Sequence, residues 1–86
     1  MSETRTPNAD DAMTEAAVLR HLLVLHPVQL TLEELVRELA DDPDEFAAKD
    51  AVARAVHELG AAGLVHRIGE VVLPSRAALR FDELLE

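Results

Sequence analysis

The sequence GLVHRIGEVVLPS, residues 63–75, predicts a short β-hairpin near the end of the chain. Two segments rich in apolar and β-branched residues, 64–67 and 71–73, flank Gly69, which is suited to the positive φ angle of a tight turn. The strand register sets which side chains point into a core, and the sequence leaves that register open. Three residues are candidates to point inward: Leu64, Val65 and Val72.

A helix that begins after Thr31 is predicted in the middle of the chain. Thr31 and Glu34 have the spacing of a capping box, in which each side chain satisfies a backbone N–H at the start of a helix. The residues before it, 28–31, are long enough only for a very short extended segment. The apolar residues of this helix share one face: Leu32, Leu35, Val36 and Leu39.

A further helix is predicted over residues 43–59. Asp42 is its expected cap, Pro43 suits the first helical position, and Glu45 completes a second capping box. Gly60 is expected to end the helix, because glycine tolerates the left-handed conformation found there. The expected buried stripe is Ala48, Val52, Ala55, Val56 and Leu59.

Two more helices are predicted at the ends of the chain. The first runs over residues 11–26 and stops at Pro27, and the last begins after Ser75. We expect the last helix to pack on the first, which is apolar on several faces. The expected stripe of the first helix is Ala12, Ala16, Leu19, Leu22, Leu23 and His26. The last helix carries Ala78, Leu79, Phe81, Leu84 and Leu85.

The length and composition indicate one small domain. The chain has 86 residues, and we expect a disordered tail over residues 1–10 and a single domain over 11–86. With only two aromatic residues, the core must be built from Leu, Val and Ala. The chain has no Cys and no apolar stretch typical of a signal peptide or a membrane span, so a cytoplasmic location without membrane attachment is expected.

The charge is strongly negative and unevenly distributed. The net charge is −9, which opposes a purely electrostatic grip on nucleic acid. Residues 1–45 contain eleven Asp and Glu against three Arg. Residues 46–80 contain three acidic residues against five Lys and Arg, so the basic share surrounds the predicted hairpin.

The order of these elements resembles the winged helix-turn-helix family of bacterial transcription regulators. The resemblance is carried by TLEELVRELADDPDEFAAKDAVARAVHELGAAGLVHRIGEVVLP, residues 31–74, which contains an LxxxGLVxR phrase leading into the hairpin. It covers roughly residues 12 to 80. It implies a mainly α fold with a three-helix core, a two- to three-stranded wing and a C-terminal helix.

The resemblance implies binding to double-stranded DNA. Helix 43–59 would read the major groove, and the wing, residues 64–73, would lie on the phosphate backbone. Two candidates have alternative roles: Arg54 can form an ion pair with Asp50 one turn earlier, and Arg67 can protect an edge strand. The residues implied in DNA binding are Lys49, Arg54, His57, His66, Arg67 and Arg76.

Carboxylates near the implied DNA-binding face favour a second interpretation. Acidic residues flank the place where helix 43–59 would enter the major groove, and Asp50 lies on the outward face of that helix. Each of these carboxylates would repel the DNA phosphates unless it points away from them or forms an ion pair. The alternative is a winged-helix module that does not bind DNA and contacts a partner protein through this acidic face or through its apolar first helix. The flanking carboxylates belong to Glu33, Glu34, Asp41, Asp42, Asp44 and Glu45.

The first helix has more apolar surface than one small domain can cover, which predicts a homodimer, because two copies can bury this surface against each other. The alternative is that residues 76–85 of the same chain cover this surface. The expected dimer interface consists of Val18, Leu25, Phe81, Leu84 and Leu85.

Catalysis, cofactors and metals have no support in the sequence. Glycine-rich phosphate loops, GxSxG and Cys are absent, so no enzyme activity is expected. The four His residues lack the spacings of zinc sites, and the acidic residues 41–45 lack the pattern of a calcium loop.

Overall fold

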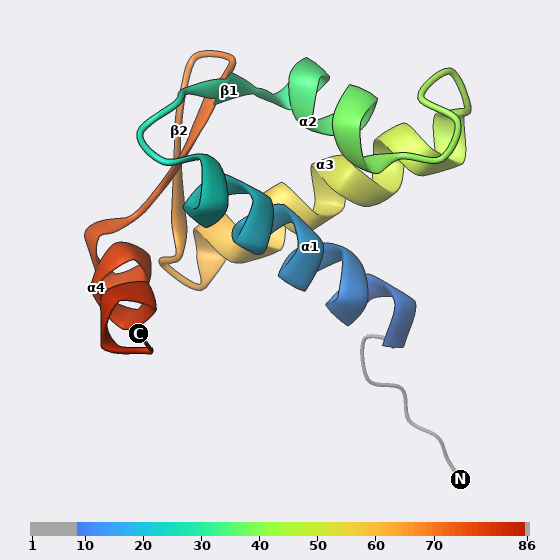
Figure 1. Cartoon of the computed structure of the whole chain (residues 1–86). Coiled ribbons are helices and arrows are strands. Elements are labelled where there is room, and N and C mark those ends of the chain that lie inside the picture. The colour runs from blue at the N-terminus through green and yellow to red at the C-terminus, as the bar shows by residue number, and fades with distance from the viewer. Residues whose placement is uncertain (1–8, 86) are drawn as a thin grey trace, which may run out of the picture.

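The computed structural model describes residues 9–85 and is mainly helical, with a small antiparallel sheet, as predicted (Figure 1). The expected tail over residues 1–10 lies largely outside the described residues, but Ala9 and Asp10 already belong to the first helix. The elements in order are α1 Ala9–Leu25, β1 Leu30–Thr31, α2 Leu32–Leu39, α3 Phe46–Ala61, β2 Val65–Ile68, β3 Val71–Pro74 and α4 Arg76–Leu84.

The predicted hairpin is formed by β2 and β3, and β1 pairs with the free side of β3. Gly69 has a φ of 62°, whereas Glu70, the second residue of the turn, does not have a positive φ. Glycine at the first central position of a two-residue turn is typical of type II′. The register settles the inward residues: Val65 and Val72 are buried and Leu64 is half-buried.

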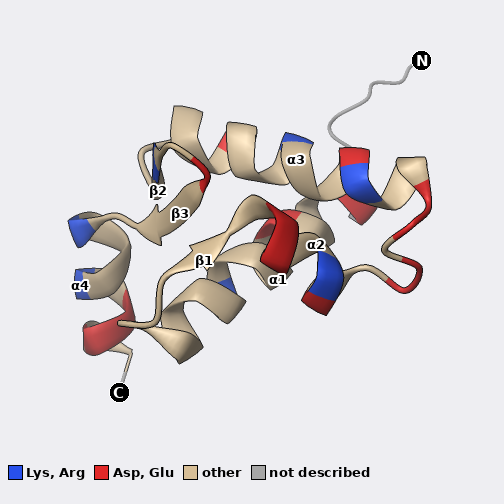
Figure 2. Cartoon of the chain, turned by 90° about the horizontal axis from the view of Figure 1, so that it is seen from above, with Lys and Arg blue, Asp and Glu red and all other residues tan. Residues whose placement is uncertain are grey.

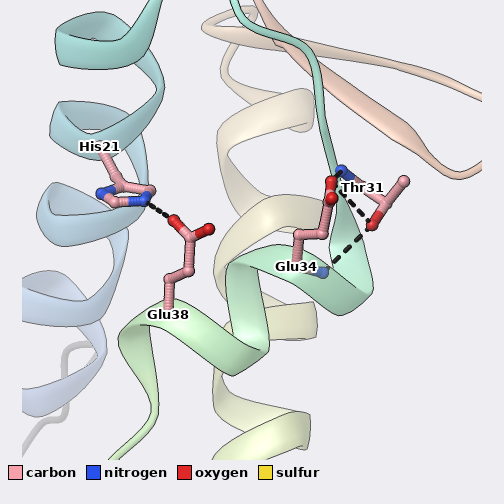
Figure 3. A network of polar contacts seen from close by, with 4 residues as sticks. All are labelled: His21, Thr31, Glu34 and Glu38. Atoms are coloured by element: carbon pink, nitrogen blue, oxygen red, sulfur yellow. Dashed lines mark hydrogen bonds and ion pairs between the residues drawn. The ribbon is translucent and has the colours of Figure 1, made fainter.

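The predicted capping box of α2 is confirmed. The backbone N–H of Glu34 donates to Thr31 Oγ1 at 3.1 Å, and the backbone N–H of Thr31 donates to Glu34 Oε1 at 2.8 Å (Figure 3). The backbone N–H of Leu32 donates to the carbonyl of Glu70 in the hairpin turn at 3.0 Å. The start of α2 is therefore attached to the sheet as well as capped.

The start of α3 differs from the prediction. The helix begins at Phe46 and not at Pro43, and its cap residue, Glu45, makes no side-chain capping bond. Asp42 uses its carboxylate to accept the backbone N–H of Asp44 at 3.1 Å, which closes a local turn. Asp side chains compete with the helix in this way, and here the turn replaces the second capping box.

The end of α3 also differs, because Gly63 and not Gly60 holds the left-handed conformation. Gly63 has a φ of 83°, and Gly60 lies inside the helix. The N–H of Gly63 donates to the carbonyl of Gly60 at 3.0 Å, and the N–H of Leu64 donates to that of Leu59 at 2.9 Å. These two bonds form a Schellman motif, which moves the helix end two residues beyond the predicted one.

The core lies between α1, α2, α3 and the inner face of the sheet. Four predicted residues of α3 are buried there, and Ala48 is half-buried. The predicted face of α1 is wrong in part, because Ala12, Ala16 and His26 are exposed while Val18 is fully buried. Larger side chains bury more apolar area than alanine, so α1 turns Val18 and its Leu residues toward the core and leaves Val24 outside. The largest fully buried residues are Val18, Leu22, Leu35, Val56 and Val72.

The last helix packs on α1, as predicted, but leaves much of its own apolar surface uncovered. Ser75 caps α4 as expected, accepting the N–H of Ala78 at 3.1 Å, and α4 contacts α1. Ala78 is the only buried residue of α4, and Phe81 and Leu84 are exposed. The apolar face of α4 is therefore open over the described residues.

Candidate nucleic-acid interface

The outward face of α3 is the first part of the candidate site. Val52, Ala55, Val56 and Leu59 hold α3 against the core, and this leaves the opposite face accessible. Asp50 lies on this face, as expected, and Ala53 beside it is half-buried. The exposed residues are Phe46, Ala47, Lys49, Asp50, Arg54 and His57.

Arg54 is held by two carboxylates. Its Nε donates to Asp50 Oδ2 at 3.0 Å, as the alternative interpretation predicts, and its Nη1 lies 3.4 Å from Asp11 Oδ1. Asp11 is on α1, so Arg54 connects α1 to α3. The sequence offered no signal for this second ion pair, because the two residues are 43 positions apart. Its charge is compensated by these carboxylates and is not freely available to DNA.

The hairpin presents its two DNA-binding candidates, His66 and Arg67, on opposite faces. His66 and Arg67 are adjacent in β2, and neighbouring strand residues point to opposite sides of a sheet. The side chains of His66 and Arg67 therefore cannot contact the same stretch of DNA backbone from one face of the hairpin. Arg67 is partly satisfied locally: its Nη2 lies 3.5 Å from the carbonyl oxygen of Gly69 and 4.0 Å from Glu70 Oε1.

The other three candidates are exposed and less constrained. Lys49 and His57 lie on α3, and Arg76 is the first residue of α4. None of the three forms an ion pair within residues 9–85. Lys49 and Arg76 are therefore the cations best able to bind a new anionic partner, and His57 adds an exposed imidazole on the same face of α3 as Lys49.

A groove runs between α2 and α3 beside the hairpin turn, with a volume of about 690 Å³. Leu32, Val36 and Phe46 contribute apolar surface to it. Figure 2 shows acidic residues gathered in the loop between α2 and α3, at one end of this region. Reading the sequence alone singled out this acidic loop but missed the groove, because Leu32 and Val36 were assigned to the core. The charged lining residues are Glu33, Asp44, Asp50 and Glu70 against Arg37 and Lys49.

The predicted dimer interface is corrected at one position. Val18 is 0% exposed and packs inside its own chain, so it is not open to a partner. Leu25 packs against the same core but is only half-buried. Phe81, Leu84 and Leu85 are exposed, as are Val24 and Val28 near the end of α1.

The histidines and carboxylates do not assemble into a metal centre in the described part of the chain. No group of three or more His, Asp or Glu side chains is placed there to hold an ion. His21 instead contacts Glu38, which joins α1 to α2 (Figure 3). Within residues 9–85 no helix has the length and apolar character of a membrane span.

Comparisons of this chain with protein-family models, with curated proteins and with solved structures found no match.

Proposed function

We propose that this chain is a winged helix-turn-helix module that binds double-stranded DNA. The observation that carries the proposal is the open outward face of α3, which lies beside the hairpin turn and carries Lys49, a cation without an ion pair in residues 9–85. A helix that follows a capped helix and precedes a hairpin has the order expected of a recognition helix and its wing. This role implies a cytoplasmic location.

In this arrangement α3 enters the major groove and the hairpin contacts the backbone. Lys49 and His57 donate to phosphates or base edges, and Arg67 and Arg76 contact phosphates. Arg54 acts mainly as a connector between α1 and α3, because contact with DNA requires it to leave Asp50 and Asp11. Neighbouring carboxylates repel phosphate, so few phosphate contacts form and the affinity is modest.

DNA binding is tested by titrating a labelled duplex at low and moderate salt. About three phosphate contacts predict that affinity falls roughly 40-fold between about 50 and 200 mM salt. Lys49→Ala and Arg67→Ala should each weaken binding several-fold, whereas Arg20→Ala, which removes an exposed cation on α1, is the matched control. Equal effects of all three variants would show that only overall charge matters and would contradict the proposal.

A second candidate is a winged-helix module that binds a protein and not DNA. It is favoured by the four carboxylates around the α2–α3 groove, which outnumber the two cations there. A chain that fails to bind the duplex even at low salt supports this candidate.

We also propose that the module forms a homodimer through α4 and the end of α1. The support is the exposure of Phe81, Leu84 and Leu85, together with Val24 and Val28. Light scattering should give a dimer mass, and Leu84→Glu should reduce it to that of a monomer. A monomer at high concentration would refute the dimer and leave the DNA proposal intact.

A further inference from the structure

The groove between α2 and α3 combines an apolar floor with sufficient size for a ligand. Its volume of about 690 Å³ lies within the range of about 300–1,000 Å³ that is typical of ligand pockets. Phe46 lines it and is 79% exposed, so this aromatic side chain is largely uncovered by residues 9–85. Clustered exposed apolar surface is typical of interaction sites, and buried aromatic anchors dominate the energy of many interfaces.

The net negative charge around the apolar floor of the groove favours a positively charged ligand. Glu33 lies in the first turn of α2, Asp44 in the loop before α3 and Glu70 at the tip of the hairpin, so carboxylates surround the floor from three parts of the chain. Asp50 on α3 also lines the groove but is already paired with Arg54. Arg37 and Lys49 offset only part of this charge, and the whole chain carries −9. A positively charged ligand with apolar side chains is therefore complementary to the groove.

We propose that the α2–α3 groove binds a basic amphipathic helix of a partner protein. The apolar side chains of this helix pack against Leu32, Val36 and Phe46, and its flanking Lys and Arg side chains pair with Glu33 and Glu70. Packing an amphipathic helix into a hydrophobic groove is an established mode of peptide recognition. The groove is lined by helices, a loop and one turn residue, so it offers no sheet edge to which an extended peptide would add.

This inference goes beyond DNA binding and does not depend on it. Lys49 and Asp50 both line the groove and lie on the outward face of α3. The partner helix and DNA would therefore occupy the same face of α3, and each would exclude the other.

The experiment measures fluorescence anisotropy of a labelled synthetic peptide of about 14 residues. It carries Leu at helical spacing on one face and Lys on both flanks, and its matched control replaces every Lys with Glu. The Lys peptide should bind saturably at low salt, and the Glu peptide at least about tenfold more weakly. Circular dichroism of each protein variant verifies its helix content.

Protein variants locate the binding site. Phe46→Ala should weaken the Lys peptide about tenfold, because it removes the exposed apolar anchor. Glu33→Gln/Glu70→Gln should weaken it by a similar factor, since it removes two of the carboxylates at the groove. Glu58→Gln/Glu83→Gln makes the same change in net charge outside the groove and should leave the affinity within about twofold.

Three results would overturn the inference: no saturable binding at low salt, equal binding of the two peptides, or insensitivity to Phe46→Ala. If a DNA duplex displaces the peptide, the result supports the inference that the peptide and DNA occupy the same face of α3. If the duplex binds without displacing the peptide, that part of the inference is overturned. A protein that binds the peptide in this pattern but never binds the duplex refutes DNA binding alone. The two proposals therefore fail separately.

Discussion

Gly60 and Gly63 provide a paired test of where α3 ends, because the same substitution should have opposite effects at the two positions. Gly63 has a φ of 83°, a conformation that costs a residue with a Cβ about 1–2 kcal/mol. No atom lies within 4 Å of a Cβ built at Gly63, so this backbone cost is the whole effect. Gly63→Ala should therefore destabilise the protein by about 1–2 kcal/mol.

Gly60 lies within α3, where alanine is the better helix former. A Cβ at Gly60 would meet its nearest atom, the carbonyl oxygen of Val65, at 3.9 Å, which is an ordinary van der Waals contact. Gly60→Ala should therefore stabilise the protein by about 0.5–1 kcal/mol. The two variants should differ by about 2 kcal/mol, or roughly 8–16 °C in Tm for a domain of this size.

Urea denaturation followed by far-UV circular dichroism measures both variants, because the chain has no Trp or Tyr for fluorescence. Equal m-values in the two variants would show that the difference lies in stability and not in the extent of unfolding. If Gly60→Ala destabilised the protein as much as Gly63→Ala, the assignment of the left-handed position to Gly63 would be refuted.

Three further predictions concern the core, the cap of α2 and the ion pairs of Arg54. Val18→Ala should lower the free energy of unfolding, measured by urea denaturation, by about 2 kcal/mol, because Val18 is fully buried. Val24→Ala should change it by less than about 0.5 kcal/mol in a dilute sample, because Val24 is exposed. Similar losses in the two variants would contradict the assigned inward face of α1. Thr31→Ala should lower Tm because loss of the cap reduces the free energy of unfolding by about 1 kcal/mol. Thr14→Ala, which removes a hydroxyl inside α1, should have little effect on Tm. An unchanged Tm in both variants would argue against the capping box. Arg54→Gln should lower the free energy of unfolding by less than about 1 kcal/mol, since both ion pairs of Arg54 are exposed to solvent. The difference between the variant and the original protein should shrink as salt is added. A loss of stability that does not respond to salt would mean that Arg54 stabilises the protein by packing.

Local patterns in the sequence predicted the parts of the fold that depend on nearby residues. The capping box at Thr31 and the tight turn at Gly69 need only a few neighbouring residues, and both are confirmed. The ends of α3 were wrong because two local solutions competed at each end. Asp42 served a turn as well as it would serve a helix, and Gly63 offered the same conformational freedom as Gly60.

Features that depend on distant residues were not predictable in the same way. The face of α1 turned inward is set by packing against the other elements, and it differs from the face chosen by spacing alone. Asp11 approaches Arg54 only because α1 and α3 pack together. The α2–α3 groove likewise combines apolar residues from α2 and α3 with a turn residue from the hairpin, and no single stretch of sequence contains all three.

The hydrogen bond from the N–H of Leu32 to the carbonyl of Glu70 has a consequence for changes in chain length. Residues inserted at the hairpin tip would displace the carbonyl that satisfies the first N–H of α2, and the sheet and the helix would both be disturbed. The loop over residues 41–45 makes its turn bonds between Asp42 and its own near neighbours, so an added segment there would leave both helices with their own bonds. A peptide tag or fused domain should therefore be tolerated between α2 and α3 and should destabilise the protein when placed between Gly69 and Glu70.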